Sequence, residues 1–337
     1  MHGHRTEPSR KSVFCFWGIH GLSRLFRTIC SGTAVILIVP LFGPVLSAQA
    51  PPNVESMELH RGMPFVQVMV NGEGPFSFVV DTGLGGEAVV SPSFAQKLRL
   101  PVSGEAEAGD PSGRNRQKVA VYLIASLTVA GVEFKGIKAT QLPPMPEQDS
   151  DGILGFALFR DYLLSLDYPH QQMLLSKGNL NPDGGKTVIP FNMPHDVPVI
   201  SLKVGSGQVD ADIDSGRMGG LGLPETFAKD LQFASPPVTV GRGRTVSGEI
   251  EIKGAQFAGN VQVAGYTFVR PFVEIDSVLP GAVFGAVPLR HFAITFDQKN
   301  KLVRLASDEQ TFTIDPPRMM ARPAPPDSQP AAPQSKQ

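Results

Sequence analysis

Short apolar segments separated by turn residues make up most of the chain. Residues 65–70 alternate in part between apolar and polar side chains, and the Asn71-Gly72 pair that follows them is a strong hairpin signal. In residues 209–213 apolar side chains alternate with Asp210 and Asp212, which predicts a strand with one apolar face. Further strands are predicted at residues 76–80, 120–129 and 132–139.

Two short helices are expected between these strands. Ser91 is a good helix cap and Pro92 suits a first turn, so a helix is predicted as far as Leu98. Residues 223–231 repeat this pattern with one extra residue. The 35 glycines and 31 prolines also favour many short strands and turns over long helices. The pattern therefore predicts an all-β fold with short helices.

Composition narrows the function only a little. A chain of 337 residues that is 42% hydrophobic can bury a sizeable core in one or two domains. The net charge of −1 disfavours binding to a phosphate backbone, so no nucleic-acid partner is expected. No Gly-x-Ser-x-Gly or His-Glu-x-x-His motif occurs, and we expect neither a metal ion nor another cofactor. The histidines beyond the N-terminal segment are scattered: His60, His170, His195 and His291.

Residues 1–50 have the features of an export signal. Basic residues end at Arg27, no further charge appears until Glu55, and Ala48-Gln49-Ala50 offers the small residues of a cleavage site. The uncharged run exceeds the roughly 18 residues that can span a bilayer, so an inner-membrane anchor through residues 31–48 is the alternative to cleavage. Either outcome makes the rest of the chain extracytoplasmic, periplasmic or secreted. Both cysteines lie in this segment, so a processed chain would have no disulfide.

Two acidic turns form the centre of a long internal repeat. Strand-like residues end at Asp81-Thr82-Gly83 and again at Asp214-Ser215-Gly216, so each turn would place a carboxylate at a strand end. A single turn of this kind is ordinary loop chemistry. Here, however, the flanking Phe-Ala-x-x-Leu segments are separated by the same 133 residues as the two acids. Ile153-Leu154-Gly155 matches Val283-Phe284-Gly285 at a spacing of 130, which indicates a duplicated lobe.

Over about residues 57 to 306 the sequence resembles the aspartic proteases, in which an Asp-Thr/Ser-Gly turn and a later apolar-apolar-Gly segment both occur twice. The resemblance implies a bilobed pepsin-like or retropepsin-like fold, with two pseudo-twofold-related, β-barrel-like lobes in one chain. It also implies that Asp81 and Asp214 form the catalytic dyad and that Thr82 and Ser215 brace the two turns against each other.

The same resemblance gives roles to four glycines. Gly83 and Gly216 would let the two turns approach closely, and Gly155 and Gly285 would pass beneath the turns where a side chain would clash.

The predicted organisation has four parts. They are residues 1–50 as signal or anchor, 54–180 as the N-terminal lobe, 187–308 as the C-terminal lobe and 316–337 as a disordered proline-rich tail. The linker between the lobes is expected within residues 178–194. Residues 103–118 are polar and glycine-rich, which suits either a flap over substrate or an ordinary exposed loop. Residues 241–248 are expected to form a turn or a substrate-facing loop.

Two positions depart from the family pattern. Small residues usually follow each Asp-Thr/Ser-Gly turn, but Leu84 and Arg217 stand here. If Arg217 pointed at the dyad, its charge would favour two ionised carboxylates and remove the shared proton that catalysis needs. If it pointed away, it would be free to contact substrate.

The predicted function is that of an aspartic endopeptidase, a monomeric hydrolase acting on peptide or protein substrates. The alternative is a catalytically silent protein of the same fold that binds peptides or another extracytoplasmic partner in its cleft.

Overall fold

The computed structural model describes residues 52–109, 116–141, 150–245 and 248–317, and all of these fall within one unit of the chain. The predicted export segment, the tip of the 103–118 segment and the tail from residue 318 lie outside this described part. Strands dominate and the helices are short, so the predicted all-β fold is confirmed.

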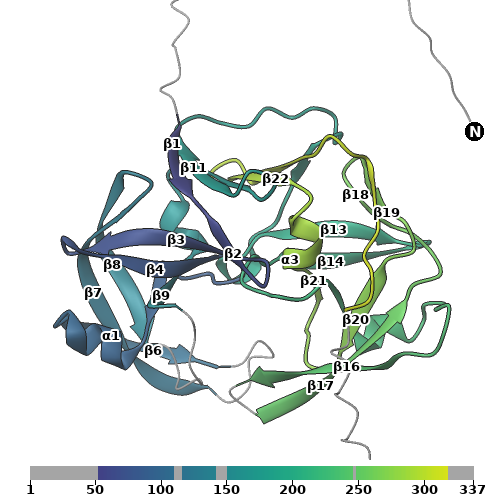
Figure 1. The fold of residues 1–337 in the computed structure, drawn as a ribbon, viewed down its shortest axis with the longest axis horizontal. Helices are drawn as coiled ribbons and strands as arrows, with labels where there is room; N and C mark the ends of the chain where they lie inside the picture. The colour runs from purple at the N-terminus through teal and green to yellow at the C-terminus, as the bar shows by residue number, and fades with distance from the viewer. Residues whose placement is uncertain (1–51, 110–115, 142–149, 246–247, 318–337) are drawn as a thin grey trace, which may run out of the picture. The chain divides into compact units, whose positions relative to one another are not determined.

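The first sheet contains eight strands in the order β2-β3-β4-β9-β5-β8-β7-β6 (Figure 1). A further pairing of β3 with β7, between Met69 and Thr128, makes the sheet curl back on itself. Asn71 and Gly72 both have positive φ at the β3–β4 turn, which confirms the predicted hairpin. The strands are β2 (Glu58–His60), β3 (Met63–Val70), β4 (Glu73–Asp81), β5 (Ala88–Val90), β6 (Val102–Ala108), β7 (Gln117–Val129), β8 (Val132–Gln141) and β9 (Gly152–Gly155).

The second sheet contains ten strands in the order β16-β17-β20-β15-β21-β14-β13-β18-β19-β24. Its centre repeats the first sheet, because β14 lies between β13 and parallel β21 just as β4 lies between β3 and parallel β9. The sequence repeat is thus a repeat of strand topology. The strands are β13 (Val199–Val204), β14 (Gly207–Ile213), β15 (Leu221–Pro224), β16 (Val238–Thr245), β17 (Gly248–Gln256), β18 (Val261–Val263), β19 (Tyr266–Phe268), β20 (Phe272–Asp276), β21 (Ala282–Phe284) and β24 (Thr311–Phe312).

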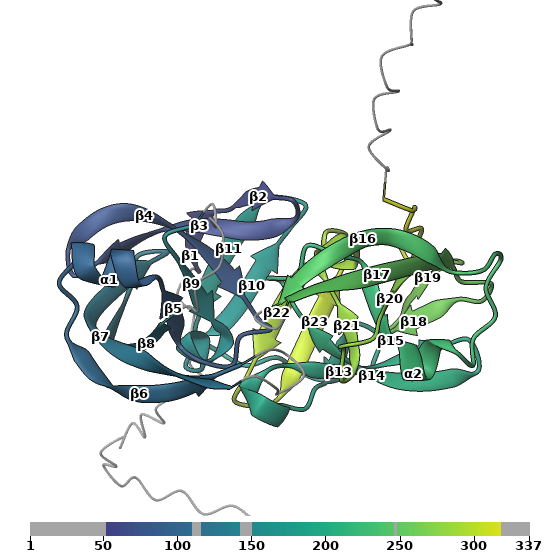
Figure 2. The ribbon, with the colours of Figure 1, turned by 90° about the horizontal axis from the view of Figure 1, so that it is seen from below.

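A third sheet takes strands from both halves of the repeat, in the order β1-β11-β10-β22-β23-β12. Figure 2 shows β10, β22 and β23 between the strands of the two larger sheets. Ser165 and Thr295 share a hydrogen bond of 2.8 Å across the β10–β22 pairing, so the two halves of the chain join directly. The strands are β1 (Asn53–Ser56), β10 (Leu163–Asp167), β11 (Gln172–Ser176), β12 (Val188–Pro190), β22 (Ala293–Asp297) and β23 (Leu302–Ala306).

The helical segments are few. The Ser91 side chain accepts a hydrogen bond from the Phe94 amide and Pro92 occupies the first turn of α1 (Pro92–Lys97), as predicted. The predicted second helix is shorter than expected: residues 221–224 form β15, and α2 (Glu225–Ala228) begins only after Pro224. The remaining helices are α3 (Ala286–Leu289) and the 3-10 turns η1 (Phe156–Phe159) and η2 (Pro194–Asp196). No helix in the described ranges is long and apolar enough to cross a membrane.

One buried apolar cluster extends through all three sheets. Where the halves meet, the Phe156 ring packs edge-on against Phe296, with ring centroids 5.1 Å apart, and against Phe191 at 6.1 Å. Full burial of a phenylalanine side chain contributes about 1.5–3 kcal/mol, so these contacts help hold the first and third sheets together.

Candidate active site

Each acidic turn follows a central strand of its sheet. Asp81 is the last residue of β4, and Asp214 comes directly after Ile213, the last residue of β14. Val80 and Ile213, the residues just before the two acids, are buried. Burial of these apolar side chains fixes each strand in the core and so sets the position of the acid at its end.

Thr82 and Ser215 join the two turns through a reciprocal set of hydrogen bonds. The Thr82 hydroxyl accepts from the Ser215 amide at 3.0 Å and donates to the Ile213 carbonyl at 2.6 Å. The Ser215 hydroxyl in turn accepts from the Thr82 amide at 2.9 Å and donates to the Val80 carbonyl at 2.7 Å. Both side chains are fully buried, so these four bonds hold the turns together without water.

Replacing Thr82 by valine is expected to lower the free energy of unfolding by about 2–4 kcal/mol, because it leaves the Ser215 amide and the Ile213 carbonyl buried without partners. Thr82→Ser keeps the hydroxyl and should stay within about 1 kcal/mol of wild type. Urea unfolding monitored by fluorescence or circular dichroism measures both variants. Equal losses for valine and serine would contradict the role given to the hydroxyl.

Glycine is required at the third position of each turn. A Cβ at Gly83 would lie 2.5 Å from Asp214 Cγ, and a Cβ at Gly216 would lie 2.3 Å from Asp81 Cγ. Each carboxyl group therefore lies against the backbone of the opposite turn, in space that a side chain would fill.

The two acids are placed as a pair. The Gly83 amide donates to Asp81 Oδ1 at 2.8 Å, and the Gly216 amide donates to Asp214 Oδ1 at 2.9 Å. Gly83 therefore touches both acids, because Asp214 Cγ lies only 2.5 Å from where a Cβ of Gly83 would stand. Burial, followed by the neighbouring Asp214 carboxyl, raises the pKa of Asp81 well above its ordinary value of 3.8. Burial also raises the pKa of Asp214. Two carboxyl groups this close resist both being ionised, so the pair holds one proton more readily than none and titrates as a unit.

Gly155 and Gly285 pass beneath the turns. A Cβ at Gly155 would lie 2.2 Å from the Gly86 carbonyl oxygen, and one at Gly285 would lie 2.6 Å from the Gly219 carbonyl oxygen. The residue after each glycine donates its amide to the turn: Phe156 to the Leu84 carbonyl at 2.8 Å, and Ala286 to the Arg217 carbonyl at 2.9 Å. These segments therefore support the backbone just beyond each acid.

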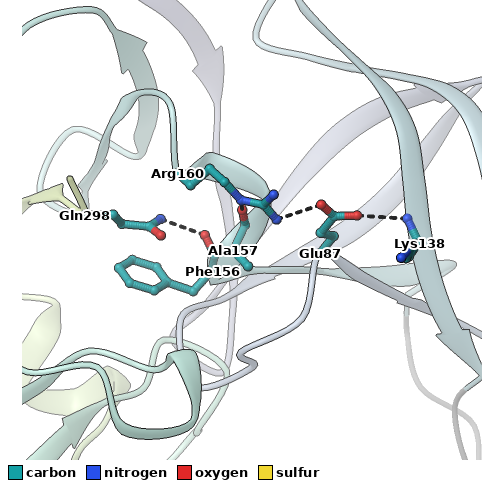
Figure 3. A network of polar contacts seen from close by, with 6 residues as sticks. All are labelled: Glu87, Lys138, Phe156, Ala157, Arg160 and Gln298. Carbon is teal, nitrogen blue, oxygen red and sulfur yellow. Dashed lines mark hydrogen bonds and ion pairs between the residues drawn. The ribbon is translucent and has the colours of Figure 1, made fainter. Parts of the chain in front are cut away.

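A further polar network fixes the segment after Gly155 (Figure 3). Glu87 accepts from Arg160 at 2.6 Å and from the Lys138 amide at 2.9 Å, while the Arg160 Nε donates to the Ala157 carbonyl. Buried Gln298 donates to the Phe156 carbonyl at 2.7 Å. A cavity of about 1090 Å³ borders Glu87, Arg160 and Gln298 but neither aspartate, so it is separate from the acid pair.

The two positions that depart from the family pattern, Leu84 and Arg217, differ in charge and in their contacts. The Arg217 guanidinium lies 3.3 Å from Glu274 Oε2 and 3.9 Å from Asp276 Oδ2, so ion pairs on β20 hold it. Leu84 carries no charge and is only partly exposed. Glu274 and Asp276 were not identified from the sequence. The signal was present, because two acids at alternate positions of an otherwise apolar strand lie on the same face of the sheet.

The remaining polar segments are placed as follows. Residues 102–108 and 117–129 pair as the β6–β7 hairpin, so the segment considered as a flap or loop is a hairpin whose tip lies outside the described residues. Residues 241–245, expected in a turn or loop, belong instead to β16, which has a bulge between Thr239 and Gly241. Asp210 is exposed, whereas Asp212 is half-buried because β13 and β21 flank its strand.

Part of the chain matches a known protein family. Residues 66–158, from β3 through Gly155 to η1, match the family model described as aspartyl protease. No curated protein matches the chain. The matched segment contains the first acidic turn, its bracing threonine and the glycine that passes beneath it.

Proposed function

We propose that this chain, which carries an aspartyl protease family domain, is an aspartic endopeptidase whose dyad is Asp81 and Asp214. One observation carries the proposal: two partly buried carboxyl groups, 133 residues apart in sequence, lie against each other's turns, and Thr82 and Ser215 join these turns by hydrogen bonds. The family match covers only the first turn, and the topological repeat supports a second, equivalent half.

The chemistry follows from one proton shared by two acids. The ionised carboxylate takes a proton from a water molecule held between the pair, and the water oxygen bonds to the carbonyl carbon of the peptide. The protonated carboxyl donates its proton to the carbonyl oxygen, which gives a tetrahedral diol. The peptide nitrogen then takes the proton acquired from water, the carbon–nitrogen bond breaks, and a diol hydroxyl returns a proton to the other carboxylate. The dyad ends with one proton, and a carboxylic acid and an amine leave.

The catalytically silent alternative depended on Arg217 pointing at the dyad. Its ion pairs with Glu274 and Asp276 offset part of its charge, which supports a dyad that keeps its proton. The raised pKa of both aspartates supports the same conclusion.

The proposal also includes the cellular location and the oligomeric state of the enzyme. The export-like residues 1–50 support an extracytoplasmic peptidase, released by cleavage or held by residues 31–48. Because a single chain supplies both acids, the proposed active form is a monomer.

Digestion of a mixed peptide library tests the function. Wild-type protein is incubated with the library from acidic to neutral pH, with a metal chelator and a serine-directed reagent present to silence contaminating peptidases. Mass spectrometry should find new termini that appear with wild type and not with Asp81→Asn. Cleavage that persists in Asp81→Asn, or a folded wild-type protein that leaves every peptide intact at all pH values, would contradict the proposal.

A further inference from the structure

The residues that follow the two acidic turns break the symmetry of the site. Each turn closes with the same backbone bond: the Leu84 amide donates to the Asp81 carbonyl at 3.3 Å, and the Arg217 amide donates to the Asp214 carbonyl at 3.4 Å. Leu84 and Arg217 therefore occupy equivalent places, but only one of them carries a charge.

The Arg217 side chain is fixed in position. Only 20% of its side chain is exposed, compared with 18% for Glu274 and 2% for Asp276, so these ion pairs are mostly shielded from water. The Arg217 terminal nitrogen also lies 3.3 Å from where a Cβ at Gly222 would stand, so a glycine leaves room for the guanidinium. Glu274 is held too, because it accepts the Gly220 amide at 3.0 Å.

The matching positions of the first sheet carry no such charges. In the second sheet Gly222 pairs with Val283 and Glu274, and the matching residue of the first sheet, Val89, pairs with Ile153 and Thr140. Thr140 thus stands where Glu274 stands, just as Leu84 stands where Arg217 stands. Of these two equivalent positions after the acidic turns, only the one in the second half supplies a positive charge.

We propose that Arg217 is a positioning residue that makes the two aspartates unequal: its fixed positive charge keeps the negative charge on Asp214 and leaves the shared proton on Asp81. Asp214 is then the base that activates water, and Asp81 is the acid that protonates the peptide carbonyl. This inference rests on the proposed peptidase function.

The charged and titratable groups around the dyad act differently on the two aspartates. The Arg217 guanidinium opposes the rise that burial causes in the pKa of Asp214, whereas the pKa of Asp81 is raised by burial and by its neighbour. Asp212 on β14 also faces Asp214, and burial, followed by the Asp214 charge, raises its pKa. Tyr168, which follows β10, is buried near both acids, and burial raises its pKa, so it stays neutral.

Glu274 and Asp276 limit how strongly Arg217 acts. An uncompensated guanidinium beside the dyad would favour loss of both protons. The negative charges of Glu274 and Asp276 weaken this effect. In this proposal, Arg217 therefore acts more on which aspartate holds the proton than on whether the pair keeps one.

The pH dependence of kcat/KM tests this inference on a peptide that wild type cleaves. Arg217→Leu introduces the residue that stands at position 84. The acidic limb of this variant's pH profile should move to higher pH, because loss of the first proton from the aspartate pair becomes harder. Arg217→Lys should restore most of the wild-type profile. Glu274→Gln keeps an oxygen for the Gly220 amide but removes a negative charge, and its acidic limb should move the opposite way, to lower pH.

The outcomes separate the inference from the function on which it rests. Two results would refute the role of Arg217 without refuting the peptidase function, provided that the wild type cleaves peptides. In the first, all three variants keep the acidic limb of the wild-type pH profile. In the second, Arg217→Leu and Glu274→Gln move that limb in the same direction. If the wild type cleaves nothing, the proposed function itself fails. Because Arg217→Leu leaves two acids unpaired, circular dichroism must show that it is folded; Glu274→Gln tests the same inference if it is not.

Discussion

Asp214→Asn is expected to lower kcat/KM for peptide hydrolysis on the order of 10³- to 10⁴-fold. Asparagine has nearly the same shape and can still accept the Gly216 amide, but it cannot take a proton from water. Asp81→Asn should also be severely impaired, because it cannot donate a carboxyl proton to the substrate. The two acids act as one unit, so the double variant should lose little more activity than the worse single variant.

Stability measurements separate this loss from unfolding. Because the folded-state pKa of Asp81 is raised above its ordinary value, the proton stabilises the folded state fully below that ordinary value, and this stabilisation is lost as pH rises through the raised pKa. Asparagine does not ionise, so Asp81→Asn should unfold at a higher urea concentration than wild type near neutral pH. An inactive variant that is less stable at neutral pH and at acidic pH alike would mean that its fold, not its chemistry, had failed.

Gly216→Ala is expected to lower kcat/KM at least about 10²-fold and the free energy of unfolding by about 1–3 kcal/mol. The added methyl group would stand 2.3 Å from Asp81 Cγ, so either the acid or the turn must move. The loss comes from displaced geometry, since no catalytic group is removed.

Gly86→Ala is the matched control. Gly86 follows the first acidic turn, a methyl group added there would meet no described atom within 4 Å, and its φ is not positive. Its alanine variant should stay within about 0.5 kcal/mol of wild type and keep its activity. Similar losses at both glycines would show that the loops are sensitive to any change and that close approach at Gly216 is not the cause.

Local chemistry explains what the sequence could predict. The Asn71-Gly72 turn and the Ser91 cap depend on residues a few positions away, and both are present in the structure. The repeat around the two acids also showed in sequence, because the same turn chemistry recurs in the same order along two equivalent sets of strands.

The features that could not be predicted from the sequence depend on contacts between residues far apart in the chain. The pairing of β10 with β22 joins residues 130 apart, and β12 lies inside the segment predicted as a linker because it pairs with distant β23. Nothing near Arg217 in sequence indicates its partners, since Glu274 is 57 residues away. The direction of the Arg217 side chain, on which its proposed role depends, could therefore be known only from the three-dimensional structure.

The most direct measurement is the titration of the Asp81 carboxyl carbon by ¹³C NMR, in wild type and in Asp214→Asn, with Asp81→Asn to assign the signal. If the two acids share a proton, Asp81 in wild type should titrate above the ordinary aspartate range, and removing the Asp214 charge should move its midpoint to lower pH. An Asp81 signal that titrates at the same pH in both proteins would contradict the central claim that the two carboxyl groups act as a pair.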